Sequence, residues 1–252
     1  MNFLYKMPDL TEIFTFTKSR TYVKDFRIGR PHQLLYENKF KNIHHPLINS
    51  DVINEKYFLS TIKGDYIYFH YRQDGMNDEG WGCAYRSLQT LFSWFILQGF
   101  TDKKVPTIYE IQQILVSIGD KSESFLGSSQ WIGSFEVSYV LNTLLGIDSK
   151  TLNISSGKEI IGKVHEFKSH FDNFGTPIMI GGGVLAYTLL GIAINEENLE
   201  ESQFLILDPH YIGPEDNKKI LDKKKGGVWW KGTKIFLPNA FYNFCCPIPQ
   251  LT

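Results

Sequence analysis

One stretch, residues 74–94 with the sequence DGMNDEGWGCAYRSLQTLFSW, constrains the fold of this 252-residue chain more than any other. It begins as a polar turn punctuated by glycines and continues as an apolar periodic segment, and Cys83 lies where the two meet. Leu88, Leu91 and Phe95 recur at helical spacing, which predicts a helix that is buried on one face. A thiol in the first turn of such a helix meets the positive end of the helix dipole and free backbone N–H groups, which favour the thiolate. Cys83 is therefore a candidate nucleophile.

The alternative is that Cys83 is a small buried hydrophobe, which is the commoner role of a lone cysteine beside an apolar helix. The composition is compatible with an enzyme, since a chain of 252 residues, 42% of them hydrophobic, can bury a core without disulfides. Its three cysteines, Cys83, Cys245 and Cys246, form no disulfide framework, which indicates a reducing compartment. The formal net charge of −1 argues against a nucleic-acid partner bound through a broad basic face. We expect no metal and no other cofactor, because no histidine has a metal-ligand spacing to the cysteines.

Residues 178–194 imitate a membrane span, because the segment is uncharged and largely apolar. It is slightly short for a span, follows Pro177 and is interrupted by three consecutive glycines at 181–183. We interpret it as two buried strands and expect no membrane span. The N-terminus also lacks the uninterrupted apolar core of a secretory signal.

Three further helices are predicted after the cysteine helix. Thr107 and Glu110 form a capping-box pattern for a helix over residues 108–118. Ser134 can cap a helix that ends at Gly146. Apolar residues at helical spacing predict another helix over residues 160–171.

Strands are predicted on both sides of these helices. Residues 66–71 alternate as a strand that leads into the turn before the cysteine, and the apolar runs 184–194 and 204–208 read as a hairpin. Helices followed by strands, without βαβ alternation, indicate an α+β fold. We assign residues 1–55 to an N-terminal extension of unassigned role and residues 56–252 to a catalytic domain.

The tripeptide Asp208-Pro209-His210 ends the last of these strands. Residues two apart in extended backbone face the same way, and a proline favours extended backbone in the residue before it, so Asp208 and His210 would share a face. A carboxylate beside an imidazole fixes its tautomer and stabilises the imidazolium. His210 could then take the proton of Cys83 or hold its thiolate in an ion pair. Taken alone, the tripeptide is more often a strand-ending turn with a surface histidine.

Two neighbouring residues before the cysteine are also candidates. His70 lies next to the end of the strand before Cys83 and is the one serious competitor of His210 as the base. Tyr71 lies twelve residues before Cys83, and its phenol could donate to a developing oxyanion together with the backbone N–H of Cys83. The alternative for Tyr71 is a half-buried aromatic residue with a solvated hydroxyl.

Five motifs follow one another along the chain: HYRQDG (70–75), GWGCAYRSLQT (80–90), QWIGS (130–134), GTPIMIGGGVLA (175–186) and FLILDPHY (204–211). Together they closely resemble the proteases specific for the ubiquitin-fold modifier, a papain-like cysteine peptidase family. The resemblance covers the chain from about Phe69 to the C-terminus.

The resemblance implies a papain-like α+β fold in which the cysteine helix packs against an antiparallel sheet. Cys83 would be the nucleophile, with His210 as the base and Asp208 as the residue that orients it. Tyr71 would be the oxyanion-hole tyrosine, and Trp131 of QWIGS would lie near the C-terminal tail of the substrate. Members of this family trim the modifier precursor to expose its C-terminal glycine and release the modifier from lysines of conjugated proteins.

The residue types also suggest how such a substrate would be selected. A modifier that ends in glycine can thread a flat tail through a narrow groove, and Trp81 and Trp131 could form the walls of that groove. Bulkier residues near the end of the tail would then be excluded by steric clash.

Two features depart from the family pattern. Tyr187 stands where the pattern GGGVLAHT has a histidine, and we expect this to affect local sheet or loop detail and to leave the mechanism unchanged. Residues 1–55 are too few for the large region with which long members reach the endoplasmic reticulum. The chain therefore resembles a short form, for which we expect a monomer in the cytoplasm, with peripheral association with the endoplasmic reticulum as an alternative.

Two other functions compete with that of a modifier-specific protease. An autophagy-type protease would share WGC and Asp-Pro-His, but AYRSLQT and QWIGS favour the first family. A catalytically silent modifier-binding module would have a damaged site, whereas Cys83, Tyr71, Asp208 and His210 are all present.

Overall fold

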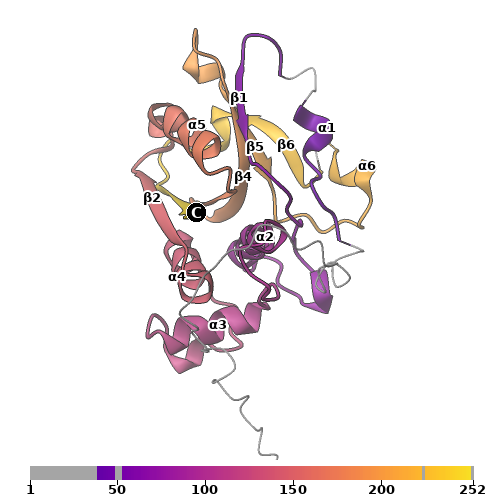
Figure 1. The fold of residues 1–252 in the computed structure, drawn as a ribbon, viewed down its shortest axis with the longest axis vertical. Coiled ribbons are helices and arrows are strands. Elements are labelled where there is room, and N and C mark those ends of the chain that lie inside the picture. The colour runs from indigo at the N-terminus through magenta and orange to yellow at the C-terminus, as the bar shows by residue number, and fades with distance from the viewer. Residues whose placement is uncertain (1–38, 49–52, 223–224, 251–252) are drawn as a thin grey trace, which may run out of the picture. The chain divides into compact units, whose positions relative to one another are not determined.

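The computed structural model describes residues 39–48, 53–222 and 225–250, and these belong to one compact unit (Figure 1). Residues 1–38, most of the predicted N-terminal extension, lie outside the described residues. The described part of that extension packs on the remainder of the unit. Lys41 forms an antiparallel bridge with Ile67, and the indole N–H of Trp230 donates to the carbonyl oxygen of Leu47 at 2.9 Å.

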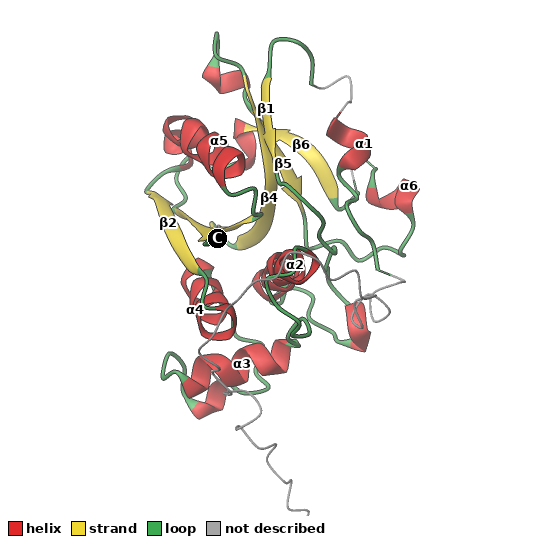
Figure 2. Cartoon of the chain, viewed as in Figure 1, coloured by secondary structure: helices red, strands yellow, loops and turns green. Residues whose placement is uncertain are grey.

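A single antiparallel sheet forms the framework of the described residues (Figure 2). Its strands follow the order β2-β7-β3-β4-β5-β6, and β1 pairs with β4 beyond the end of β3. The α+β class is thereby confirmed. The strands are β1 (Phe58–Thr61), β2 (Asp148–Ile154), β3 (Ile178–Gly182), β4 (Leu185–Ile194), β5 (Gln203–Leu207), β6 (Val228–Gly232) and β7 (Tyr242–Ile248).

The segment that imitates a membrane span forms β3 and β4, two paired strands of this sheet, as predicted. The predicted hairpin is confirmed as well, because β4 pairs with β5 in antiparallel register. Within the described residues, no helix is both long enough and apolar enough to cross a membrane.

The helices pack against this sheet or against one another. Helix α2 contacts β3 and β4, α4 contacts β2 and β7, and α5 contacts β1 and β4. The predicted capping box of α3 is confirmed, since the Thr107 hydroxyl accepts the Glu110 N–H and the Glu110 carboxylate accepts the Thr107 N–H. The helices are α1 (His45–Ile48), α2 (Cys83–Leu97), α3 (Ile108–Ser117), α4 (Ser134–Leu145), α5 (Val164–Asn173) and α6 (Asn217–Ile220).

Two helix boundaries differ slightly from the prediction. Gly133 is the N-cap of α4, and Ser134 is its first residue; the helix ends at Gly146, which takes the left-handed conformation with φ 66°. The predicted helix over residues 160–171 is divided, because a 3₁₀ turn over residues 157–163 precedes α5.

Helix α2 is more deeply buried than its apolar spacing indicates. Each of its residues from Ala84 to Ile96 is buried, so the prediction of burial on one face only was wrong. The predicted strand over residues 66–71 was wrong for a related reason. This segment is extended, but two hydroxyls of α2 take the place of a neighbouring strand: Ser93 Oγ accepts the Ile67 N–H at 2.9 Å, and Thr90 Oγ1 accepts the Phe69 N–H at 3.1 Å.

Because α2 is buried along almost its whole length, its packing should contribute strongly to the stability of the fold. Phe92 on α2 is fully buried, whereas Phe58 on β1 is 57% exposed. We expect Phe92→Ala to lower the free energy of unfolding by about 3–5 kcal/mol, because it leaves a cavity in the core. The same change at Phe58 should alter it by about 0.5 kcal/mol or less. Urea unfolding with linear extrapolation measures both, and equal losses would contradict this account of the core.

Candidate active site

Cys83 is the first residue of α2, directly after the N-cap residue Gly82. No side chain of the described residues caps this helix end, so free backbone N–H groups and the positive dipole end remain next to the thiol. Cys83 is partly exposed and unpaired, whereas the free thiols of Cys245 and Cys246 are buried in β7. Burial raises the pKa of Cys245 to about 12 and also raises that of Cys246. Of the three thiols, Cys83 alone has an environment that favours a thiolate.

The pKa of the Cys83 thiol reflects two opposing effects. Burial is the largest and by itself raises the pKa, because it disfavours the charged form. Hydrogen bonding to His210 and the charge of His210 oppose it, followed by the backbone N–H of Ala186 and the hydroxyl of Tyr71. The net result is a pKa below the ordinary value of 9.0. These neighbours therefore stabilise the thiolate in a site that would otherwise disfavour it.

Asp208 and His210 lie together, but not for the predicted reason. Strand β5 ends at Leu207, and the two residues lie in the turn that follows, so they do not share a strand face. Instead the Asp208 carboxylate turns back toward the chain. Its Oδ1 accepts the backbone N–H of His210 at 2.9 Å and lies 2.6 Å from His210 Nδ1. This hydrogen bond fixes the orientation of the imidazole.

The charge state of His210 follows from the same contacts. Burial lowers its pKa, but the hydrogen bond to Asp208 and the interactions with Cys83 outweigh burial and raise the pKa from 6.5 to about 9. Because Nδ1 is bonded to Asp208, the interaction with Cys83 uses the buried Nε2, and a proton can pass between these two groups. Near neutral pH the site therefore favours an imidazolium beside a thiolate.

Tyr71 reaches the same centre from the segment before α2. Its backbone N–H donates to the carbonyl oxygen of Pro209 at 2.9 Å, which joins that segment to the Asp-Pro-His turn. Its ring contacts the ring of His210 edge to face, with centroids 5.2 Å apart. Burial, followed by the nearby charge of Cys83, raises the pKa of the Tyr71 phenol. The phenol thus keeps its proton and can donate a hydrogen bond.

The structure separates His70 from this chemistry. Its ring is 4% exposed and packs between Tyr68 and Tyr211, with centroid distances of 5.0 and 5.2 Å. Its Nδ1 lies 2.9 Å from the carbonyl oxygen of Tyr71. Burial lowers the pKa of His70 to about 4, so the ring is neutral and serves the packing of the segment. His70 does not compete with His210 as the base.

A groove begins at Cys83, and both predicted wall residues line it. Trp131 is 56% exposed, and its indole N–H donates to the carbonyl oxygen of Gly80 at 3.3 Å. Glycines let the chain segments of the groove approach closely, since a Cβ on Gly182 would lie 2.3 Å from the carbonyl oxygen of Phe241. The lining residues are Trp81, Cys83, 131–134, 181–186, Phe241 and Asn243.

Residues of β4 contribute to the site in a way that the sequence did not indicate. Tyr187, predicted to affect only local sheet or loop detail, contacts the ring of His210 with centroids 5.4 Å apart. Ala186 contributes a backbone N–H toward Cys83. A backbone donor leaves no sequence signal, but a tyrosine at the end of a glycine-rich motif could have marked the position. Among the described residues, no group of three or more potential ligands is arranged to hold a metal ion.

Comparison with known proteins gives consistent matches. A model of the family described as Peptidase family C78 matches residues 58–245. Ufm1-specific protease 2 of Rattus norvegicus is 46% identical over 240 residues, which cover 95% of this chain and 51% of that protein. The Ufm1-specific protease of Caenorhabditis elegans is 51% identical over 191 residues, 76% of this chain and 32% of that protein.

A crystal structure of UfSP from C. elegans superposes with a TM-score of 0.74 at 44% identity and covers 84% of this chain and 38% of that one. The chain thus spans about half the length of the first relatives, 51% of the rat protein and 59% of the Danio rerio protein.

The geometry of the site predicts how Cys83 reacts with a small alkylating agent. The rate of alkylation by iodoacetamide, plotted against pH, should have its midpoint below 9.0, because the pKa of Cys83 is lowered. In His210→Gln the midpoint should move upward, since burial then acts without the opposing imidazolium. Mass spectrometry of peptides would follow the reaction, with the buried Cys245 and Cys246 as internal controls. An unchanged midpoint in the variant would contradict the ion pair.

Proposed function

This chain belongs to peptidase family C78, and from that membership we propose that it is a cysteine peptidase that cleaves bonds at the C-terminal glycine of the ubiquitin-fold modifier. The observation that carries the proposal is the convergence of His210, Asp208 and Tyr71 around Cys83, which lines a groove. The substrate is supported by the names of the relatives, which are Ufm1-specific proteases.

The first half of the reaction forms a thioester. The Cys83 thiolate attacks the carbonyl carbon of the glycine, and the negative charge that develops on the oxygen accepts hydrogen bonds from the Tyr71 hydroxyl and the Cys83 backbone N–H. The His210 imidazolium then gives its proton to the departing amine as the carbon–nitrogen bond breaks. Asp208 holds the imidazole in the tautomer that this transfer requires.

The second half releases the modifier. His210, now neutral, takes a proton from water, the resulting hydroxide attacks the thioester, and Cys83 leaves as a thiolate. The departing amine of the first half can be the α-amine of a precursor peptide or the side-chain amine of a lysine. The same site would therefore trim the precursor and release the modifier from conjugates.

The two alternative functions have less support. A silent binding module would not need the charge pairing of Cys83 and His210, and an autophagy-type protease is not indicated by the names of these relatives.

We further propose that the protein acts as a monomer in the cytoplasm, with peripheral association with the endoplasmic reticulum as an alternative. Three unpaired thiols support a reducing compartment.

The proposed function predicts a covalent product with a mechanism-based probe. The mature modifier, carrying an electrophile in place of its C-terminal carboxylate, should add its full mass to the protein, and peptide mapping should place the adduct on Cys83. Cys83→Ser should give no adduct, and His210→Ala should slow turnover of a modifier substrate by roughly 10²- to 10⁴-fold.

A ubiquitin probe of the same chemistry serves as the control and should not react. Binding of the modifier without an adduct would favour the silent binding module. Equal labelling by ubiquitin would remove the assigned specificity.

The groove predicts a steric preference at the end of the substrate tail. Replacing the terminal glycine of the modifier with a bulky residue such as leucine should lower kcat/KM by at least about tenfold, because a larger side chain would clash with Trp81 and Trp131, which line the groove. A fluorogenic C-terminal amide of each modifier would measure this, with a substitution on the far side of the modifier as the control. Equal cleavage of both tails would exclude the groove as the source of specificity.

A further inference from the structure

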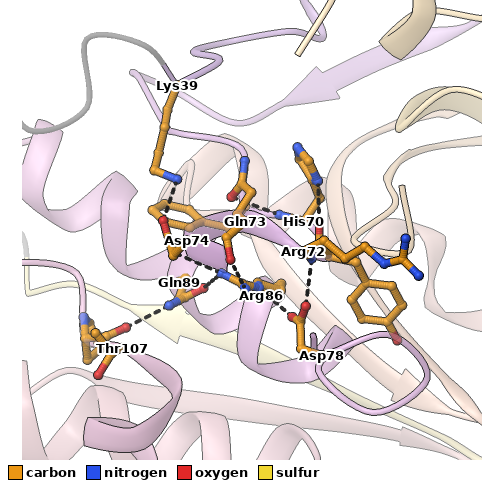
Figure 3. Close-up of polar contacts among 12 residues, drawn as sticks. Lys39, His70, Arg72, Gln73, Asp74, Asp78, Arg86, Gln89 and Thr107 are labelled. Atoms are coloured by element: carbon orange, nitrogen blue, oxygen red, sulfur yellow. Dashed lines mark hydrogen bonds and ion pairs between the residues drawn. The ribbon is translucent and has the colours of Figure 1, made fainter. Parts of the chain in front are cut away.

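A buried carboxylate joins the two segments that carry Tyr71 and Cys83 (Figure 3). Asp78 is completely buried, and both of its carboxylate oxygens are used. Its Oδ1 accepts the backbone N–H of Arg72, the residue after Tyr71, at 2.7 Å. Its Oδ2 accepts the Nε–H of Arg86, which lies on α2 three residues after Cys83, at 2.6 Å.

The backbone of Asp78 strengthens this connection at the cysteine end. Its carbonyl oxygen accepts the N–H groups of Trp81 at 3.2 Å and of Gly82 at 2.8 Å. Gly82 is also in close contact with the side chain, because a Cβ at this position would lie 2.5 Å from Asp78 Oδ2. The residue before the nucleophile therefore rests directly against the carboxylate.

Arg86 also holds Asp78 in place. Figure 3 shows residues of the loop 72–78 around the Arg86 guanidinium. The side chain is 1% exposed. Its NH2 group donates to the carbonyl oxygen of Gln73 at 3.0 Å, and its NH1 group donates to Asp74 Oδ2 at 3.2 Å and Gln89 Oε1 at 3.1 Å. A planar group with donors in fixed directions can satisfy all of these acceptors at once, which a lysine ammonium cannot do.

The backbone of the loop would not keep its path without these bonds. Arg72 and Asp74 both take the left-handed conformation with φ 60°, which is unfavourable for residues that have a side chain. Arg72 directly follows Tyr71, so its conformation sets the direction in which the chain leaves the tyrosine. Asp78 binds the N–H of this strained residue and thereby fixes the backbone beside Tyr71.

We propose that Asp78, held by Arg86, is a positioning residue that sets where the Tyr71 hydroxyl lies relative to the Cys83 sulfur and the oxyanion. This inference rests on the proposed function, because it assumes that Tyr71 donates to the oxyanion. Asp78 does not touch the reacting atoms; it acts through Tyr71. Its negative charge also contributes to the raised pKa of Tyr71, after burial and the influence of Cys83, and so helps the phenol to keep its proton.

A double-mutant cycle with Tyr71→Phe tests this role. Asp78→Asn keeps the size of the side chain but removes the charge that pairs with Arg86. We expect it to lower kcat for a fluorogenic modifier amide by roughly 10- to 100-fold, since small misplacements of a catalytic group have effects of that order. KM should change by less than about threefold. In the Tyr71→Phe background, Asp78→Asn should lower kcat by less than about threefold, because the hydroxyl that Asp78 positions is already absent.

Two controls separate positioning from a general loss of structure. Alkylation of Cys83 by iodoacetamide needs the thiolate but no oxyanion donor, so its rate in Asp78→Asn should stay within about threefold of the unaltered protein. Asp74→Asn makes the same chemical change in another carboxylate that pairs with Arg86 but whose hydrogen bonds within the described residues go to Lys39 and Arg86, not to the backbone of Arg72 or Gly82. Its side chain is 55% exposed, and turnover should stay within about twofold.

Three results would overturn the proposal: unchanged turnover in Asp78→Asn, additive losses in the double mutant, or alkylation that falls in parallel with turnover. If circular dichroism shows that Asp78→Asn does not fold, Gly82→Ala takes its place in the cycle, because its methyl group would displace the carboxylate while keeping both charges. The unaltered protein is measured in the same assay. Absence of turnover there would count against the proposed function itself, whereas normal turnover with an unaffected variant would count against the positioning role alone.

Discussion

The burial of α2 around its whole circumference is the constraint on which the other parts of the structure depend. Most polar groups on a helix that is buried on all sides need hydrogen-bond partners. Ser93 and Thr90 meet this requirement by accepting backbone N–H groups of the extended segment 66–71, and Arg86 meets it by binding the loop before the cysteine. The polar residues of α2 thus hold in place the chain that leads to Tyr71, and the buried helix organises the site at its own first turn.

Within the site, burial and charge act in opposite directions on the same groups. Burial raises the pKa of Cys83 and lowers that of His210, so it favours the neutral thiol and the neutral imidazole. The ion pair between them, supported by Asp208, reverses both effects. The thiolate and the imidazolium stabilise each other strongly, because electrostatic interactions in this partly desolvated site are stronger than in water. His70 is also buried, but no carboxylate of the described residues is bonded to its ring, and burial lowers its pKa to about 4.

The groove beside Cys83 depends on the same sheet that supports α2. Gly182 at the end of β3 lets the backbone approach the segment at Phe241, and Tyr187 near the start of β4 packs against His210. The ring of His210 is therefore held between two aromatic rings, those of Tyr71 and Tyr187. A histidine at position 187, as in the family pattern, would place a second titratable ring in that contact. The tyrosine gives this chain a neutral neighbour instead.

The sequence by itself determined the elements whose signals are local. The periodic run after Cys83, the capping box at Thr107 and the apolar runs of β4 and β5 depend on neighbours within a few residues. Helices α2 and α3 and the β4–β5 hairpin appear where these patterns predict them. Site residues with chemical character, Cys83 and the Asp-Pro-His turn, could be named for the same reason. The family pattern identified Tyr71 and Trp131, although neither has a distinctive local signal.

Only the tertiary structure decided how those residues act together. It showed that a turn rather than a strand face brings Asp208 to His210, and that hydroxyls of α2 replace a strand partner for residues 66–71. It placed His70 in a packed position away from Cys83 and revealed the contact of Tyr187 with His210. Most of these facts depend on burial and on contacts between residues that are distant in the sequence, from about twenty positions for Phe69 and Thr90 to more than a hundred for His70 and Tyr211. Such contacts have no local pattern, because they arise only when the sheet closes over the cysteine helix.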